Sequence, residues 1–394
     1  MKNHQLVTFL SAYQALYSLI LICYSCFLLC GCITEWESKD TDGIEGILVV
    51  EGIIIDDESV ITLSRSKELS YEDNIFDLSP YHVTDAKVYI ECDDGTQWGV
   101  ARQNSGQYTI ETGKLNPARQ YRLIIVMKET DKTYEYQSEF ASPMVTPEID
   151  SVFWTQKEKE QPVYIHVATH APDDMVRYFR WSYSEDWEIK AQIPMPNADD
   201  PIPFFCSKKS KSREMLIGTT ERSASGQLVD IITEIPPRND RLTVLYRMDV
   251  TQQAISKQAF DYFINVKKNS RKTGSLFAHV PAELKGNIIC TTDPGRVVIG
   301  YVDVSSSARK VMYIHGLGVD EDMNCGLWTA YDLRQKFGPN IPDEYQYYSY
   351  PSNYVLRKCV NCAENGGRSI FELEDWPNQY TKMDWYIEYF ENLQ

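Results

Sequence analysis

The chain has 394 residues and a formal net charge of −17, because 39 Lys and Arg side chains face 56 Asp and Glu side chains. This acidity argues against nucleic acid and anionic lipid headgroups as partners, since both bind clustered basic side chains. It favours a well-hydrated exposed body, and the length fits two or three domains.

The first residues resemble a bacterial export signal. Lys2 is positive and no residue from Leu6 to Leu29 is charged, as in the first two regions of a signal peptide. The run ends in Leu29-Cys30-Gly31-Cys32, which resembles a lipobox, where the cysteine after a small residue is acylated. We therefore expect residues 1–31 to be a lipoprotein signal peptide and Cys32 to carry the lipid. An uncleaved membrane anchor is the alternative, because about 20 apolar residues can span a bilayer.

Residues 32–43 are polar and acidic, which predicts a flexible tether between the membrane and the first domain. Acidic residues just after a lipidated cysteine also resemble the surface-export signals of Bacteroidota lipoproteins. A solvated tether predicts the same composition, so both interpretations stay open.

Residues 44–146 show the pattern of a β-sandwich, with seven short strands in about a hundred residues. Asp93-Asp94-Gly95-Thr96 and Glu129-Thr130-Asp131-Lys132 each join two strands and predict hairpins. The expected strands are Ile47–Ile55, Val60–Ser64, Ala86–Cys92, Gln97–Ala101, Tyr108–Thr112, Tyr121–Met127 and Tyr134–Phe140. We expect an immunoglobulin-like or transthyretin-like module.

Residues 147–394 predict a second β-rich domain, which starts after a boundary near Thr146. Its first strands are expected at Ile149–Trp154, Val163–Thr169 and Tyr178–Ile193. Apolar residues at helical spacing predict a helix over Ser256–Lys268, capped by Ser256 and packed on a sheet. The polar stretch Lys208–Arg213 predicts a loop. The fold class is therefore mainly β, with one or more helices in the second domain.

Six cysteines remain besides those of the signal peptide and the lipid site, an even number that an oxidising compartment can pair. Only Cys359 and Cys362 are close in sequence. Their C-x-x-C spacing admits a local disulfide, half of a zinc site or a redox pair, and we favour the disulfide. The other four can be buried free thiols.

No standard catalytic or metal motif is present. His166 and His170 lie in an alternating β run, where residues four apart stand roughly 13 Å from each other, too far to share one ion. Asp320, Asp322 and Asn324 resemble the start of a calcium loop, but Cys325 stands where that loop needs glycine. We expect no catalytic residue, no metal ligand and no cofactor, while a looser calcium site stays open.

Aromatic residues are the feature best suited to recognition. Five tyrosines crowd a Pro-flanked segment: Tyr345, Tyr347, Tyr348, Tyr350 and Tyr354. Tyrosine offers large rigid contact area with a polar tip. These residues are the candidate ligand or partner contacts, and the alternative is ordinary strand and core tyrosine.

Several short motifs fall in an order that resembles the domain-of-unknown-function family 4249 of Bacteroidota lipoproteins. They are Leu48–Gly52, Asp85–Val88, Gly106–Tyr108, Ile149–Val152, Ala259–Phe263, Gly274–Phe277, Gly286–Ile288, Gly300-Tyr301 and the cysteine pair with Gly366-Gly367. The family typically ends in a Pro-Asp-Phe-Trp-like sequence, whereas here Glu374-Asp375-Trp376-Pro377 is followed by a tail that reaches Gln394. The resemblance therefore says nothing about that tail.

Members of the family are commonly encoded beside TonB-dependent outer-membrane receptors. The resemblance thus implies a non-enzymatic accessory role in uptake of a nutrient or metal complex, with such a receptor as the partner. It also implies a lipid-anchored outer-membrane protein, for which we expect surface exposure over a periplasmic face. A stand-alone ligand-binding or adhesion lipoprotein is the second hypothesis, and an envelope hydrolase with an unrecognised site is the third.

Overall fold

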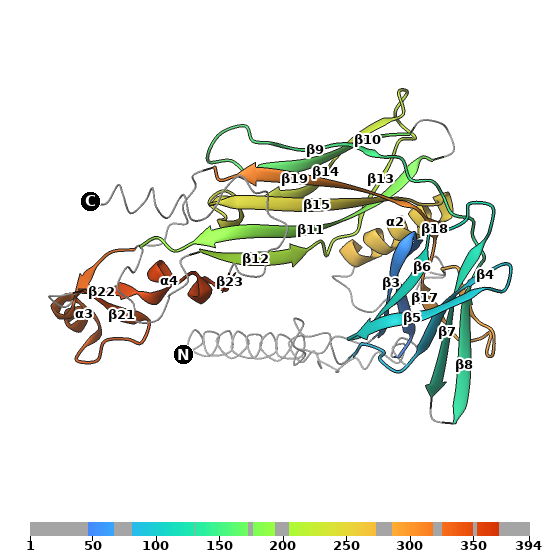
Figure 1. Ribbon diagram of the computed structural model, residues 1–394, viewed down its shortest axis with the longest axis horizontal. Coiled ribbons are helices and arrows are strands. Elements are labelled where there is room, and N and C mark those ends of the chain that lie inside the picture. Colours follow the sequence, from blue (N-terminus) through green and yellow to red (C-terminus); the bar gives the residue numbers. More distant parts are fainter. Residues whose placement is uncertain are drawn as a thin grey trace, which may run out of the picture. The chain divides into compact units, whose positions relative to one another are not determined.

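The chain is mainly β, as the sequence predicts (Figure 1). The computed structural model describes residues 46–66, 81–129, 131–171, 176–193, 205–272, 286–317, 325–349 and 353–369. The expected signal peptide, the tether and Cys32 lie outside these ranges. Within them, no helix has the length and apolar character needed to cross a bilayer.

The first sandwich is built from one nine-stranded sheet in the order β16-β8-β7-β4-β5-β6-β3-β1-β17. Its strands are β1 (Leu48–Glu51), β3 (Asp57–Arg65), β4 (Lys87–Cys92), β5 (Gln97–Asn104), β6 (Gln107–Gly113), β7 (Tyr121–Glu129), β8 (Lys132–Ser138), β16 (Ile288–Cys290) and β17 (Val298–Gly300). Alternate side chains of each strand point to one face. On β3 and β6, Ile61, Leu63 and Ile110 are fully buried there. The sheet curls around this core, since its end strands β16 and β17 touch.

Both predicted hairpins are confirmed. β4 ends at Cys92 and β5 begins at Gln97, and Gly95 between them has a φ of +88°, which glycine adopts without steric cost. Asp94 Oδ1 accepts a hydrogen bond from the Thr96 backbone at 2.9 Å and closes the turn. The second hairpin pairs Glu129 with Lys132.

The first sheet is not confined to residues 44–146, so the predicted boundary near Thr146 omits two of its strands. β16 pairs with β8, and β17 pairs in parallel with β1. Gly300 allows this return, because its φ is +151° and a Cβ there would lie 2.4 Å from the carbonyl oxygen of Val50. Short parallel strands β2 (Ile54–Ile55) and β18 (Val304–Ser305) add a second connection between distant segments.

The second sandwich consists of a six-stranded sheet packed against a three-stranded sheet. The larger sheet has the order β19-β15-β11-β12-β23, with β13 also paired to β11, and the smaller sheet has the order β14-β10-β9. Its strands are β9 (Ile149–Thr155), β10 (Val163–His170), β11 (Tyr178–Lys190), β12 (Phe205–Lys211), β13 (Leu216–Thr219), β14 (Gln227–Ile235), β15 (Leu245–Ala254), β19 (Ser307–His315) and β23 (Arg368–Ser369). A 3-10 turn (Asp240–Leu242) precedes β15. The buried cluster includes Ile165, Phe179, Trp181, Tyr246 and Met248.

Most of the polar stretch predicted as a loop, Lys208–Lys211, belongs to strand β12. Its backbone pairs with β11 from Phe205 to Lys211. Cys206 and Ser207 are buried whereas Lys209 and Lys211 are exposed. Pairing with the long neighbouring strand outweighs the low strand propensity of lysine and serine.

The predicted helix is confirmed as α2 (Lys257–Lys272), two turns of which carry the buried Ala259, Tyr262 and Phe263. Ser256 caps it, since its Oγ accepts a hydrogen bond from the Ala259 backbone at 3.1 Å. The helix packs on β11, where Arg180 lies 5.2 Å from the centre of the Phe263 ring.

Asp303 joins α2 to the first sandwich. Its carboxylate accepts hydrogen bonds from the backbone of Ser256 at 2.7 Å and of Val304 at 3.2 Å. Its carbonyl oxygen accepts one from the Ile54 backbone at 2.9 Å. Asp303 is 5% exposed, and this burial raises the pKa of its carboxyl group despite the hydrogen bonds from Ser256 and Val304.

We call the described residues of 325–369 the C-terminal lobe. It contains β20 (Trp328–Thr329), α3 (Ala330–Phe337), β21 (Tyr345–Ser349), β22 (Asn353–Leu356), α4 (Arg357–Val360) and a 3-10 turn (Cys362–Asn365). Strand β23, at the end of the lobe, pairs with β12 of the second sandwich.

The predicted disulfide between Cys359 and Cys362 is wrong. Cys362 pairs with Cys206 of β12, and Cys359 pairs with Cys325, each with a Cα separation of 5.7 Å, within the usual range for a disulfide. The two neighbouring cysteines cannot pair because they point into different buried clusters. Cys362 lies in the core of the second sandwich and Cys359 lies in that of the lobe. Cys92 and Cys290 are buried free thiols.

Candidate functional site

One face of the C-terminal lobe carries a row of aromatic rings. Trp328 lies opposite Tyr354, and Tyr354 lies opposite Tyr347, on the adjacent strands β20, β22 and β21. Residues directly opposite on neighbouring strands project to the same face. The rings of Tyr347 and Tyr354 meet edge to face, with centroids 6.0 Å apart. We call Trp328, Tyr354 and Tyr347 the aromatic row.

The five tyrosines predicted as contacts separate into different environments. Tyr347 is 53% exposed and Tyr354 is half-buried. Tyr345 is only 8% exposed and packs 5.8 Å from the Phe337 ring, so it supports the lobe instead of offering a contact. The side chain of Tyr348 and the whole of Tyr350 lie outside the described residues. The row thus contains two predicted tyrosines and one tryptophan that the sequence did not single out.

Helix α3 packs beside the aromatic row, next to β20. Thr329 and Asp332 form a reciprocal capping box at its start, which satisfies backbone donors at the helix N-terminus. Near its end, Lys336 Nζ lies 5.0 Å from the centre of the Trp328 ring and 5.1 Å from that of Phe337. These cation–π contacts place one positive charge beside the row.

The lobe is anchored beneath the row. Val355 on β22 is fully buried and clusters with Cys359 and Val360. The backbone N–H groups of Gln192 and Ile193, which follow the end of β11, donate to the Cys359 carbonyl oxygen at 2.8 and 2.9 Å. An anchored aromatic surface with phenol hydroxyls suits recognition of a partner, because aromatic side chains lose little entropy on binding.

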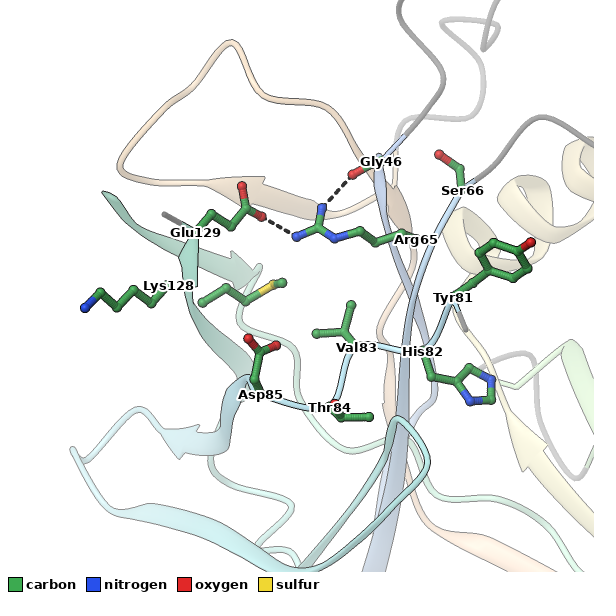
Figure 2. Close-up of a pocket in the computed structure, with 11 residues that line it drawn as sticks. Gly46, Arg65, Ser66, Tyr81, His82, Val83, Thr84, Asp85, Lys128 and Glu129 are labelled. Carbon is green, nitrogen blue, oxygen red and sulfur yellow. Dashed lines mark hydrogen bonds and ion pairs between the residues drawn. The ribbon is translucent and has the colours of Figure 1, made fainter. Parts of the chain in front are cut away.

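A second candidate site is a cavity of about 600 Å³ at one end of the first sandwich. Its walls come from the segment before β1, the end of β3, the segment leading into β4 and the end of β7 (Figure 2). The lining residues are Gly46, Arg65, Ser66, Tyr81, His82, Val83, Thr84, Asp85, Met127, Lys128 and Glu129. Sequence analysis missed this site, since no local motif indicates that four separate strand ends meet there.

An ion-pair network closes one side of the cavity. Arg65 donates to the Gly46 carbonyl oxygen at 2.6 Å and to Glu129, as Figure 2 shows. The other oxygen of Glu129 accepts from Arg296, whose guanidinium lies 4.0 Å from the centre of the Tyr134 ring. Burial opposes the charge of Glu129, but the hydrogen bonds and charges of Arg65 and Arg296 outweigh it, and they hold the pKa of Glu129 below its ordinary value.

The two histidines of β10 make separate contacts. His166 Nε2 lies 2.8 Å from Thr155 Oγ1, and its ring stacks on Phe153 with centroids 4.9 Å apart. His170 Nδ1 lies 2.7 Å from Asp150 Oδ1. In the part of the chain that the structure describes, no three His, Cys, Asp or Glu side chains gather as a metal site. The calcium-like segment with Asp320, Asp322 and Asn324 falls outside that part.

Comparison with known proteins gives one family match. The model of a family described as Domain of unknown function (DUF4249) matches residues 34–311. A search of curated proteins finds no match. The aromatic row lies beyond the matched range, whereas the cavity lies inside it.

Two solved structures show a weak likeness. A segment of two fibronectin type-III domains from chicken tenascin has 9% identity, with 54% of this chain and 91% of that chain covered and a TM-score of 0.16. The chicken interferon gamma receptor alpha chain has 10% identity, with 53% and 89% covered and a TM-score of 0.16. These values carry no argument about function.

Proposed function

The chain belongs to the DUF4249 family, and from this premise we propose that it is a lipid-anchored outer-membrane protein that acts, without catalysis, as the partner of a TonB-dependent receptor. We infer the receptor from the family resemblance, because members of that family are commonly encoded beside such receptors. Cys32 is the proposed lipid site, and the surface of the cell is the proposed location.

The aromatic row is the observation that carries the proposal of a binding role. Tyr347 exposes 53% of its surface, and large exposed aromatic side chains are enriched where proteins meet. The lobe that presents it is joined to the body by Cys206–Cys362 and braced by Cys325–Cys359. Disulfides persist in oxidising compartments outside the cytoplasm, which supports export.

A pull-down from native membranes in mild detergent tests this function. The tagged full-length chain is compared with Tyr347→Ala and with Ile231→Ala, a control that is 50% exposed on the second sandwich. We expect a TonB-dependent receptor in stoichiometric amount with the wild type and with Ile231→Ala. Loss of Tyr347 should weaken capture, by about 2 kcal/mol if it is an interface hot spot.

Two further results bear on the proposal. Cys32→Ala should abolish incorporation of a labelled fatty acid into the chain, because Cys32 is the proposed site of the acyl chains. If the wild-type protein comes down alone, the transporter hypothesis fails and independent capture takes its place.

Stand-alone ligand binding is the second candidate function, and the cavity of the first sandwich is what favours it. Its volume of about 600 Å³ lies within the range of about 300–1,000 Å³ that is typical of small-molecule sites.

A further inference from the structure

The larger sheet of the second sandwich carries charged side chains on the face that points away from the core. Residues directly opposite on neighbouring strands project to the same face, and this defines two rows across β12, β11, β15 and β19. Trp187, which follows Asp186 on β11, is buried in the core, so the rows face outward, because successive side chains of a strand alternate. We call them the outer rows: Lys209, Asp186, Arg247 and Tyr313 form the first, and Lys211, Ser184, Asp249 and Val311 form the second.

The charge left over on the outer rows is positive. Arg247 donates to Asp186 at 2.9 Å and to Asp249 at 3.0 Å, so both acids of the rows already have a basic partner. Lys209 and Lys211 are exposed, and within the described residues neither forms an ion pair. An acidic chain of net charge −17 thus presents two uncompensated positive charges side by side on one sheet face.

The outer rows also expose apolar surface. Tyr313 and Val311, at the β19 end of the two rows, are each 37% exposed. A segment that covers this face therefore needs carboxylates for the lysines and apolar or aromatic side chains for the β19 end.

The sequence after β23 has both kinds of side chain. Residues 370–394 have a net charge of −5, because Lys382 stands against six acids: Glu372, Glu374, Asp375, Asp384, Glu388 and Glu391. The same residues include seven aromatic side chains: Phe371, Trp376, Tyr380, Trp385, Tyr386, Tyr389 and Phe390. We call residues 370–394 the acidic tail.

The acidic tail begins at the edge of the same sheet. Ser369 of β23 pairs with Cys206 of β12. Lys209 and Lys211 lie three and five residues farther along β12, about 10 and 17 Å at the rise of a strand. The tail has 394 − 369 = 25 residues, which span far more than this distance when extended. Being tethered gives it a high effective concentration at the face, whereas an acidic segment of another protein is repelled by the net charge of this chain.

We propose that the acidic tail docks on the outer rows of its own chain, with its carboxylates paired to Lys209 and Lys211 and its aromatic side chains against Tyr313 and Val311. The contact with the lysines is electrostatic, so it weakens as salt screens the charges. This inference does not depend on docking to a receptor.

Zero-length crosslinking of the full-length protein in detergent tests the proposal. A carbodiimide joins a lysine Nζ to a carboxylate in contact with it by an amide bond and takes up the water that is released, and peptide mass spectrometry identifies the pair. Unlabelled and isotope-labelled protein are mixed, so that links within one chain are distinguished from links between two copies. Lys132, exposed in the hairpin between β7 and β8, is the control. We expect links from Lys209 and Lys211 to acids of the tail in the same chain, and none from Lys132.

A variant in which all six tail acids become amides gives a second measurement. Its Lys209 and Lys211 should be acetylated about fivefold faster than in the wild type, since two surface ion pairs together contribute roughly that factor, while the rate at Lys132 stays the same. A thermal unfolding curve like that of the wild type shows that the variant is folded.

Three results would overturn the proposal. The first is that Lys209 and Lys211 link to no carboxylate, or only to residues 32–43 or to a second copy. The second is that Lys132 links to the tail in equal yield, which would mean that the tail has no preferred site. The third is an unchanged acetylation rate of both lysines in the amide variant.

Discussion

Removing the two disulfides separately should destabilise the protein by different amounts. Cys206 and Cys362 are 156 residues apart, whereas Cys325 and Cys359 are 34 residues apart. A disulfide stabilises mainly by restricting the unfolded chain, and more so for a longer loop. The loop-length relation gives about 5 kcal/mol for Cys206–Cys362 and about 4 kcal/mol for Cys325–Cys359 at 25 °C.

The assay is denaturant unfolding of two double variants, Cys206→Ser/Cys362→Ser and Cys325→Ser/Cys359→Ser, under oxidising conditions. Tryptophan fluorescence reports on the second sandwich, since Trp187 lies in the same buried cluster as Cys206 and Cys362. We expect the first variant to lose more free energy of unfolding. Loss of the second disulfide should act on the lobe, where Cys359 is buried with Val355 and Val360.

Peptide mapping of the non-reduced wild type gives the decisive control. The expected fragments join residue 206 to 362 and residue 325 to 359. A crosslinked fragment that joins Cys359 to Cys362 would refute the pairing. Equal stability of both double variants and the wild type would refute the reasoning from loop length.

Three other changes test the packing and the electrostatics. Glu129→Gln leaves Arg65 and Arg296 without a charged partner, so it should lower the free energy of unfolding by about 1–2 kcal/mol at pH 7. Because the pKa of Glu129 is lowered in the folded state, the stability difference between the wild type and Glu129→Gln should be present above the unfolded pKa of about 4.3 and should disappear as the pH falls through the folded value. Urea unfolding across that pH range checks this prediction. A stability difference that stays constant with pH would contradict it. The pKa of Asp303 is raised in the folded state, so its contribution to the free energy of unfolding is fully present below the unfolded pKa of about 3.9 and is lost as the pH rises through the folded value. Urea unfolding from about pH 4 to 7 should show the wild type losing stability relative to Asp303→Asn. Parallel profiles of the two proteins would count against the raised pKa. Gly300→Ala should lower the free energy of unfolding by about 1–3 kcal/mol or more, and with it the melting temperature, because the φ of Gly300 is positive and Val50 leaves no room for a Cβ. An unchanged melting curve would contradict the parallel pairing of β1 with β17.

The elements of the fold that depend on local sequence were predictable. Gly95 marks a hairpin because of its backbone freedom, and Ser256 marks the start of α2 because its hydroxyl can accept from the helix backbone. The alternation along β3 and β10 shows which face is buried.

The features that depend on distant segments were not predictable. Nothing near Ile288 or Val298 indicates that both strands return to the first sheet, since their partners lie far away in the sequence. The pairing of Cys362 with Cys206 likewise depends on β12. The sequence of β12 alone predicts a loop, and its strand conformation depends on pairing with β11. Tyrosines in one short segment cannot be sorted into buried and exposed without knowing that Phe337 packs on Tyr345.

Site-specific photo-crosslinking in living cells tests the central proposal most directly. Tyr347 is replaced with benzoylphenylalanine in the full-length chain, and Ile231 is replaced in the same way as a control of similar exposure. The account predicts a light-dependent product between position 347 and a TonB-dependent receptor, with none from position 231. The absence of a receptor product at position 347, or equal products from both positions, would contradict it.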